Sequence, residues 1–504
     1  MPVRKASFGL SVAALSSIIY LALHYISNSI NNAVKEPYMD EIFHVPQAQR
    51  YCQGNFTYYD PKITTPPGLY LFTYARIWLR DIVLIRRSNL ICDTIDLRRT
   101  NHSIAILNFV TLVLIQLTAG DRVNLSRRYG FKQRAFHTLN NSTTYDLVRI
   151  ILNSLVILLL PPLFFFNSLY YTDAGSVLFT LLVYLFSLID QHLLAALCGI
   201  VSILFRQTNV VWVFYVACLT ILRTFEEHHK RQNLRKSQQH QQQAKTNSRS
   251  HHGGDQSNLV TSESAPGSYC YLPDKQLLFA LIKRCTPYAM VGVSFIGFVF
   301  INKGIVLGDK EAHQPRLHSA QVLYFLGFCS MFGTTWVLHL RILKRFLYFT
   351  IRTPLVAVLV SALVIYLISF GRYAHPYLLA DNRHITFYIW RRILDRHNSY
   401  VPFMLTPIYL VSSFSVWHHL RSKGCKQMLL FLFCTILVTV PNGLLELRYF
   451  IIPYIFLRLN ADTSLESSLC ELLQQIFIIT SMHYLFIYKT FHWTDSSELQ
   501  RIMW

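Results

Sequence analysis

The sequence predicts an all-α protein that crosses a membrane many times. Of its 504 residues, 52% are hydrophobic and only 14% are charged, whereas soluble proteins contain about 25% charged residues. The apolar residues form blocks of about 17–25, the length that an α-helix needs to cross the hydrocarbon core of a bilayer. Counting these blocks predicts a polytopic membrane protein with about 11–13 transmembrane helices.

The net charge is +21, because 47 lysines and arginines outnumber 26 acidic residues. In a soluble protein such an excess would suggest nucleic-acid binding. Here the basic residues gather in short loops between apolar blocks, as they do in the cytosolic loops of membrane proteins. We therefore attribute the charge to topology, and we expect the lipid bilayer rather than nucleic acid as a partner.

Residues 1–27 are expected to form the first transmembrane helix. Arg4 and Lys5 precede an apolar run, Phe8–Ile26, which a signal peptide would also show. The run is long, however, and no small-x-small cleavage motif follows it. We therefore expect a retained helix with its N-terminus in the cytosol.

The next segment, residues 28–100, is expected to be a loop on the non-cytosolic side. Apolar and polar residues alternate between Ile42 and Tyr51, which suits a helix lying in the membrane interface. Pro46 has no amide hydrogen, so we expect it to interrupt this helix or to begin a second short one. Leu69–Leu79 is a second interfacial or re-entrant segment, because it is short for a full span.

In the rest of the chain, successive apolar blocks are taken to cross the membrane in opposite directions, and the loops between them are assigned to alternate sides. Residues 101–222 are expected to hold transmembrane helices 2–6, and residues 276–504 to hold helix 7 and those that follow it. Between them, residues 223–275 are polar, basic and rich in Gln, Ser and His, which predicts a disordered cytosolic loop. In this topology the polar, motif-like loops all fall on the same side as residues 28–100.

An acidic pair, Asp40 and Glu41, stands just behind the first apolar block, although acidic residues are scarce in this chain. In a helical turn Asp40 and His44 share one face, and Glu41 points about 100° away. A carboxylate in a partly desolvated site beside cations is suited to take a proton from an attacking hydroxyl. The alternative is structural, with Asp40 capping the turn and Glu41 paired with a lysine. His44 and the TTPPG turn at residues 64–68 favour the catalytic interpretation.

The loops on the same side also carry cations, which the positive-inside rule disfavours there. These cations are Arg206, Lys310, His313, His318, Arg372, His375, Arg383, His384 and Arg448. Clustered basic side chains at a bilayer face suggest that a phosphate or pyrophosphate is held and its charge stabilised. The alternative is that they anchor the loops at the membrane surface.

A metal site is not expected. The ten cysteines are scattered, with no CxxC pair and no Cys/His cluster at zinc spacing. A three-histidine site made by His313, His318 and His375 is conceivable, but the sequence has no HxxxH or HExxH pattern. Cys52 and Cys92 fall in one non-cytosolic loop, and the sequence leaves open whether they pair.

Signals for nucleotide binding are missing as well. The chain has neither GxxxxGK[ST] nor a GxGxxG motif after a strand, and no soluble α/β domain that would bind a sugar nucleotide is predicted. An enzyme of this kind would therefore take its activated donor from the membrane. A lipid-linked phosphate meets that requirement.

Six stretches of the sequence carry a resemblance to a known family: EPYMDEIFHVPQAQRYC, DPKITTPPGLY, FRQTN, GDKEAHQPRLHSAQ, HPYLLADNRHITFYIWRR and ELRYFIIPY. In these stretches, which run from about Glu36 to about Pro453 in the same order, the sequence resembles the dolichyl-phosphate-glucose-dependent α-1,2-glucosyltransferase family. The resemblance implies a GT-C-type glycosyltransferase with interfacial helices, a multi-pass protein of the endoplasmic reticulum membrane whose active site faces the lumen. The implied reaction, with inversion, moves glucose from dolichyl phosphate glucose to the dolichyl-pyrophosphate-linked Glc2Man9GlcNAc2 oligosaccharide.

The resemblance also implies roles for individual residues. By comparison with other GT-C enzymes, Asp40 is the general base, and Glu41 orients the acceptor or shares that role. Lys310, Arg372 and Arg383 are expected to hold the donor phosphate. The wider substrate-binding set consists of His44, Arg206, His313, His318, His375 and Arg448. Neither a metal nor another cofactor is implied.

Two other functions remain open from the residues alone. A transporter or channel-associated subunit would carry charges inside its spans and internal repeats, but the apolar blocks hold few charges and show no repeat. A non-catalytic assembly subunit would keep the fold without needing the acids.

Overall fold

The computed structural model describes residues 2–83, 92–120, 142–250, 274–311, 314–394, 400–494 and 498–504. The first half of the chain forms α1 (Pro2–Ala33), α2 (Glu41–Cys52), α3 (Gly68–Val83), α4 (Thr94–Gly120), α6 (Thr144–Leu158), α7 (Pro161–Asn167), α8 (Asp173–Leu188), α9 (His192–Phe205), η2 (Gln207–Asn209) and α10 (Val210–Ser250). The second half forms α11 (Lys275–Asn302), α12 (Gln321–Phe332), α13 (Thr334–Val337), α14 (Leu340–Arg352), α15 (Pro354–Phe370), α16 (Pro376–Ala380), α17 (Ile385–Ile389), η3 (Trp390–Leu394), α18 (Val401–Met404), α19 (Thr406–Arg421), α20 (Cys425–Thr439), η4 (Leu447–Phe450), α21 (Ile451–Asn460) and α22 (Leu465–Tyr488), followed by β1 (Thr490–His492) and β2 (Leu499–Arg501).

The helices confirm the predicted class, an all-α polytopic membrane protein. Within the described ranges, five helices are long and apolar enough to cross a membrane, or seven if each of two bent pairs counts as one span. The bent pairs are α6 with α7, at 70°, and α14 with α15, at 110°. Four more apolar helices, α8, α9, α12 and α20, are shorter than 18 residues. These short helices account for the difference from the about 11–13 spans that block counting predicts.

Close helix packing builds the interior of the N-terminal half. Gly175 of α8 faces Phe205 at the end of α9, and a Cβ added at Gly175 would clash with that aromatic ring. Gly199 of α9 likewise faces Val213 of α10. Small residues at such positions let neighbouring helices approach, which is how helices gain packing energy in a bilayer.

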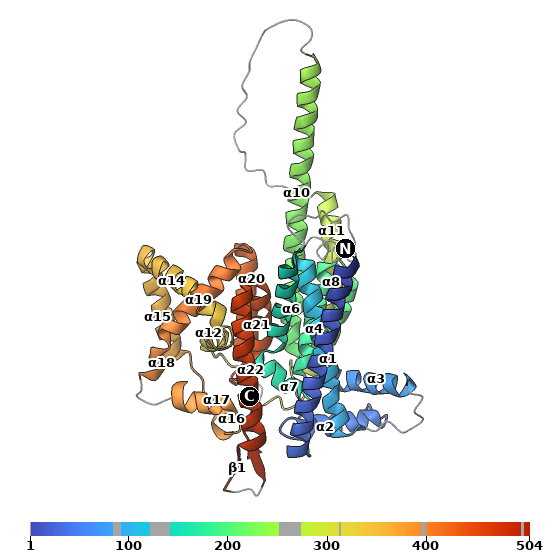
Figure 1. Cartoon of the computed structure of the whole chain (residues 1–504), viewed down its shortest axis with the longest axis vertical. Coiled ribbons are helices and arrows are strands. Elements are labelled where there is room, and N and C mark those ends of the chain that lie inside the picture. Colours follow the sequence, from blue (N-terminus) through green and yellow to red (C-terminus); the bar gives the residue numbers. More distant parts are fainter. Residues whose placement is uncertain are drawn as a thin grey trace.

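The long α10 and the interfacial helices mark the two ends of the bundle. α10 extends far beyond the other helices at one end, whereas α2 and α3 run across the bundle near the other end, where α7, α16, α17 and the β-hairpin also lie (Figure 1). The chain starts at the α10 end and finishes at the α2 end (Figure 1). The C-terminal hairpin therefore shares an end with the loop that follows α1.

The prediction that Pro46 interrupts the first interfacial helix is wrong. α2 runs without a break from Glu41 to Cys52 with Pro46 inside it. Proline removes one backbone hydrogen bond, which here would run to the carbonyl of Ile42, near the start of the helix. Ile42 lies in the first turn of α2, so only one bond near the helix start is lost and the helix continues to Cys52.

The predicted disorder of residues 223–275 is also wrong for its first part. α10 continues as helix to Ser250, and residues 251–273 lie outside the described residues. The sequence from 223 to 250 is rich in Gln, Lys and Arg, which have high helix propensity. Because the apolar half of α10 already provides the helical nucleus, extending it costs little free energy.

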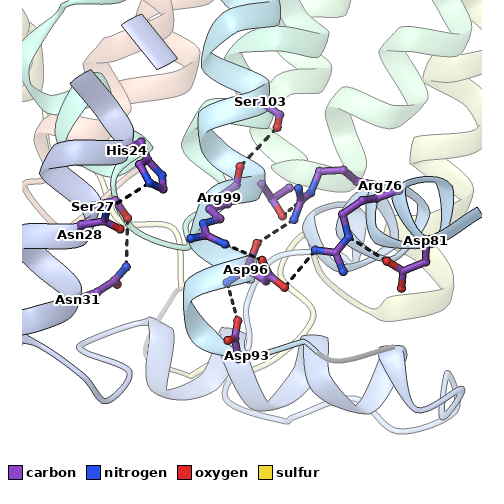
Figure 2. A network of polar contacts seen from close by, with 12 residues as sticks. His24, Ser27, Asn28, Asn31, Arg76, Asp81, Asp93, Asp96, Arg99 and Ser103 are labelled. Atoms are coloured by element: carbon purple, nitrogen blue, oxygen red, sulfur yellow. Dashed lines mark hydrogen bonds and ion pairs between the residues drawn. The ribbon is translucent and has the colours of Figure 1, made fainter. Parts of the chain in front are cut away.

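Figure 2 shows how α3 is fixed against the start of α4. Asp96 accepts a hydrogen bond from Arg80 at 3.1 Å, and the Asp96 carbonyl accepts one from Arg76 at 2.8 Å. A disulfide joins Cys52 at the end of α2 to Cys92 just before α4, so the pairing that the sequence left open is present. These contacts hold α2 and α3 against the start of α4.

Candidate active site

Asp40 lies directly before α2, on the end of the bundle where the motif loops meet. Its Oδ2 accepts a hydrogen bond from Nη1 of Arg448 at 3.1 Å, across 408 residues of sequence. Its backbone amide donates to the hydroxyl of Tyr171 at 3.2 Å. The Asp40 side chain is 43% exposed and that of Arg448 is 15% exposed. The carboxylate is therefore fixed from one side and reachable from the other.

Arg448 belongs to a chain of alternating charges that starts at Asp40. Nη2 of Arg448 lies 2.9 Å from Oε2 of Glu446, and its Nη1 lies 3.9 Å from Oδ2 of Asp173. Nη2 of Arg206 lies 3.0 Å from the other oxygen of Asp173. We call Asp40, Arg448, Asp173 and Arg206 the charge chain. It links four segments that are far apart in sequence, and each member touches a residue of opposite charge.

The charges around Asp40 keep it ionised. Desolvation by the surrounding protein favours the neutral acid, but the positive charge of Arg448, with the charges that His44 and His384 carry when protonated, outweighs it, so the pKa of Asp40 lies below its ordinary 3.8. His44 shows the reverse balance, because burial outweighs Asp40 and lowers the pKa of His44. Nδ1 of His44 lies 2.6 Å from the hydroxyl of Tyr70. At neutral pH the site thus pairs a free carboxylate with a neutral imidazole.

We expect Arg448→Gln to move the acid limb of the pH–rate profile to higher pH. Arg448 is the strongest of the charges that lower the pKa of Asp40. Without it the desolvation remains, so the pKa of Asp40 rises and its basic form is lost earlier as the pH falls. The measurement is kcat/KM against pH for the wild type and the variant.

The matched control for this profile is Arg206→Gln, which removes a cation that binds Asp173 rather than Asp40. Its acid limb should move less than that of Arg448→Gln. Equal shifts in the two variants would mean that Arg448 has no specific effect on Asp40.

Glu41 is adjacent to Asp40 in sequence but has a different environment. Its Oε1 accepts hydrogen bonds from Nε of Arg98 at 2.9 Å and from the amide of Tyr170 at 2.7 Å. Its Oε2 is paired with Nη2 of Arg98, and both side chains are fully buried. Because no carboxylate oxygen reaches solvent, the geometry does not fit the expectation that Glu41 orients the acceptor or shares the catalytic role. Its partner is Arg98, not the lysine of the structural alternative.

The loops around Asp40 brace one another. The carbonyl of Thr64, in the TTPPG turn, accepts hydrogen bonds from Nε2 of Gln207 at 2.6 Å and from the amide of Leu307 at 3.2 Å. The amide of Asp309 donates to the carbonyl of Pro61 at 3.1 Å. A Cβ at Gly308 would clash with that carbonyl, so only glycine fits there. Three of the quoted sequence stretches, DPKITTPPGLY, FRQTN and GDKEAHQPRLHSAQ, therefore contact one another.

The three cations expected to hold a donor phosphate are engaged locally. Lys310 donates to the carbonyl and side-chain oxygens of Asn302, and Arg372 donates to the carbonyl of Leu394. Both oxygens of Asp381 accept hydrogen bonds from Arg383, at 2.9 and 2.7 Å. None of the three contacts Asp40 in the described part of the chain.

The histidines of the predicted set mostly shape loops. Nδ1 of His318 lies 3.0 Å from the carbonyl of Gly443, which fixes the loop before Glu446. His375 caps α16 by accepting from the amide of Tyr377 at 3.2 Å. Nδ1 of His384 lies 2.8 Å from the backbone oxygen of Trp504. His313 lies outside the described residues, and within them no group of three His, Cys, Asp or Glu side chains could hold a metal ion.

Sequence reasoning missed Asp173 and Glu446. Asp173 is the first residue of α8 and only 3% exposed, and one of its oxygens has no hydrogen-bond donor among the described residues. A signal for both was present, because each is a rare acid in a loop that the alternation of spans puts on the side of Asp40. In these loops the candidates predicted from the sequence include only basic residues and leave out the acids.

Comparison with known proteins assigns the chain to a family. The model of the DIE2/ALG10 family matches residues 34–459. A rat protein named Dol-P-Glc:Glc(2)Man(9)GlcNAc(2)-PP-Dol alpha-1,2-glucosyltransferase is 36% identical over 499 residues, covering 98% of this chain and 99% of the relative. Proteins of the same name from human and Arabidopsis thaliana are 34% and 33% identical, each again covering 98% of this chain and 99% of the relative. No solved structure matches.

Proposed function

The chain belongs to the DIE2/ALG10 family, and from that premise we propose that it transfers the terminal glucose from dolichyl phosphate glucose to lipid-linked Glc2Man9GlcNAc2 in α-1,2 linkage. Its relatives from rat, human and Arabidopsis carry that activity in their names. The donor and the acceptor are both membrane-anchored lipids, which agrees with a multi-pass membrane protein. The transporter interpretation gains no support from these relatives.

The observation that carries the mechanism is the half-exposed, ionised Asp40 held by Arg448. In the proposed step the acceptor hydroxyl attacks the anomeric carbon of the donor glucose and gives its proton to Asp40. The bond from that carbon to the phosphate oxygen breaks, and dolichyl phosphate leaves with the electron pair. Attack opposite the leaving phosphate inverts the anomeric configuration. Arg448 and Arg206 are suited to offset the negative charge that gathers there.

Glu41 has a positioning role in this proposal. Its ion pair with Arg98 ties the first turn of α2 to α4, and Asp40 immediately precedes that turn. Residues 28–100 thus form the loop that supplies the base. The remaining segments, residues 1–27, 101–222 and 276–504, supply the membrane helices and the facing loops, and residues 223–275 connect two of those helices.

We further propose that the Asp40 end of the bundle faces the lumen of the endoplasmic reticulum. The basic extension of α10 lies at the opposite end (Figure 1), and basic loops favour the cytosol. The disulfide Cys52–Cys92 also lies at the Asp40 end, and disulfides persist in oxidising compartments.

The profile of lipid-linked oligosaccharides in cells lacking the protein tests the proposed function. We expect the precursor with two glucoses to accumulate and the precursor with three to disappear, because the last transfer has no catalyst. Reintroducing the wild-type chain should restore the complete precursor. A normal profile in the deficient cells would contradict the proposed reaction, and accumulation of a shorter precursor would assign the protein to an earlier step.

A further inference from the structure

A hollow of about 440 Å³ lies at α17 and η3, and no role has been assigned to it so far. Phe387, Tyr388, Arg391 and Arg392 line it. Two aromatic rings and two arginines on consecutive turns give it an apolar wall beside a strongly basic one. The hollow lies at the end of the bundle that holds Asp40, since α17 lies at the same end as α2, which Asp40 directly precedes (Figure 1).

Arg391 and Arg392 differ from the other cations at this end of the bundle in their lack of polar partners among the described residues. The guanidinium of Arg391 lies 5.9 Å from the ring centroid of Phe387, and that of Arg392 lies 5.8 Å from the ring of Tyr388. In the described part of the chain, neither guanidinium pairs with a carboxylate or donates a hydrogen bond. Lys310, Arg372 and Arg383, in contrast, are all bonded locally. Two neighbouring, unneutralised guanidinium groups attract an anion with several acceptor oxygens.

The backbone that presents these arginines is unusual. Trp390–Leu394 forms a π-helical turn, a wide geometry that is rare and frequent at functional sites. Trp390 is 2% exposed and packs its ring 6.4 Å from that of His318. Arg372 donates to the carbonyl of Leu394 at the other end of the turn. The turn is thus fixed at both ends while Arg391 and Arg392 remain exposed between them.

We propose that this hollow binds the phosphate of dolichyl phosphate glucose, with Arg391 and Arg392 as its ligands. The inference rests on the proposed glucose transfer. The donor phosphate is bonded directly to the glucose that reacts, so it must lie near Asp40. The acceptor pyrophosphate is separated from the attacked glucose by the whole glycan and has no such constraint. Exposed apolar side chains nearby, Tyr377, Leu379 and Ile393, suit the isoprenoid chain of the donor.

An interfacial anchor is the competing explanation for two exposed arginines. An anchor would bind any lipid surface and would not distinguish a phosphorylated polyprenol from an unphosphorylated one. A phosphate site would make that distinction, and it would affect one substrate of the reaction more than the other. Kinetics with both substrates therefore separate the two explanations.

The first test is the double variant Arg391→Gln/Arg392→Gln in purified, detergent-solubilised full-length protein. We expect KM for dolichyl phosphate glucose to rise by about 10–100-fold, because charge-assisted hydrogen bonds are lost. The kcat should fall less than KM for the donor rises, since Asp40 is intact, and KM for the acceptor should not change. Arg391→Lys/Arg392→Lys keeps the charges without the forked geometry and should give an intermediate KM.

The matched control is Arg352→Gln/Arg421→Gln. These arginines are also exposed and stacked on an aromatic ring one helical turn earlier, Tyr348 at 4.9 Å and Trp417 at 4.6 Å. They end α14 and α19, and α14 lies away from α17 in the bundle (Figure 1). This variant should keep the wild-type KM for both substrates. An equal rise of the donor KM in both double variants would identify the arginines as general anchors and overturn the proposal.

Product inhibition gives the second test. Dolichyl phosphate should compete with the donor in the wild type and do so at least about tenfold more weakly in Arg391→Gln/Arg392→Gln. Dolichol without phosphate and inorganic phosphate, at the same concentration, should inhibit little. Dolichol lacks the phosphate group, and inorganic phosphate lacks the isoprenoid chain. If inorganic phosphate inhibits as strongly as dolichyl phosphate, the hollow is a site for a free anion rather than for the lipid phosphate, and the proposal is wrong.

Failure of this inference differs from failure of the proposed function. If the wild type transfers no glucose, the proposed function fails. If the wild type transfers glucose and Arg391→Gln/Arg392→Gln keeps the wild-type donor KM, the phosphate site alone is wrong. A rise in KM for the acceptor only would also overturn it. If the glutamine variant does not accumulate, the lysine variant must show the intermediate donor KM for the proposal to stand.

Discussion

Asp40→Asn is expected to lower the rate of glucose transfer by about 10²–10⁴-fold, the range that a general base contributes. The amide has the size of the carboxylate and can still accept the hydrogen bond from Arg448, but it cannot take a proton at neutral pH. The folded protein should be retained, since the Asp40 side chain is 43% exposed. The measurement is transfer from dolichyl phosphate glucose in microsomes, together with the amount of the protein.

The control for this result is Asp93→Asn, in the same loop. Asp93 accepts a hydrogen bond from the amide of Asp96 at 2.7 Å at the start of α4, and asparagine caps a helix about as well as aspartate. Transfer should therefore be unchanged in Asp93→Asn. Wild-type transfer in Asp40→Asn would show that Asp40 is not the base.

The positions of the membrane helices were largely predictable from the sequence. The ranges expected to hold membrane helices, residues 101–222 and 276–504, contain the apolar helices α8 (Asp173–Leu188), α9 (His192–Phe205) and α15 (Pro354–Phe370). The interior of a bilayer offers no hydrogen-bond partners to the backbone, so an apolar run that crosses it must satisfy its own backbone groups by forming a helix. α4 was predicted less well, since it begins at Thr94 with charged residues that the hydropathy pattern assigned to the loop.

The partners of charged residues were not predictable in the same way. Asp40 and Arg448 are 408 residues apart, and topology predicts only that they share a side of the membrane. Asp40 and Glu41 look equivalent in sequence. They differ in the direction in which the first turn of α2 points their side chains. That turn aims Glu41 at Arg98 of α4 and leaves Asp40 beside Arg448. A partner chosen by tertiary packing leaves no local signal.

The difference between the two acids gives the second large prediction. Glu41→Gln should lower the stability of the protein by about 3–5 kcal/mol, because it leaves the charge of Arg98 buried without a partner. Arg98 is fully buried and also donates to Asn31 and to the carbonyl of Val34, so it cannot turn to solvent. The measurement is thermal unfolding of the detergent-purified protein, compared with Glu36→Gln, which changes an exposed carboxylate before α2.

The combination Glu41→Gln/Arg98→Met makes this test specific for the ion pair. It removes the unpaired charge and replaces it with an apolar side chain of similar length, so it should recover part of the stability that Glu41→Gln loses. Activity per folded molecule should fall much less in both variants than in Asp40→Asn, because the base itself is retained and only the contact that positions its helical turn is changed. A Glu41→Gln protein that unfolds like the wild type but transfers no glucose would reverse the assignment. Glu41 would then act on the substrate, and its buried pair with Arg98 would have to open during the reaction.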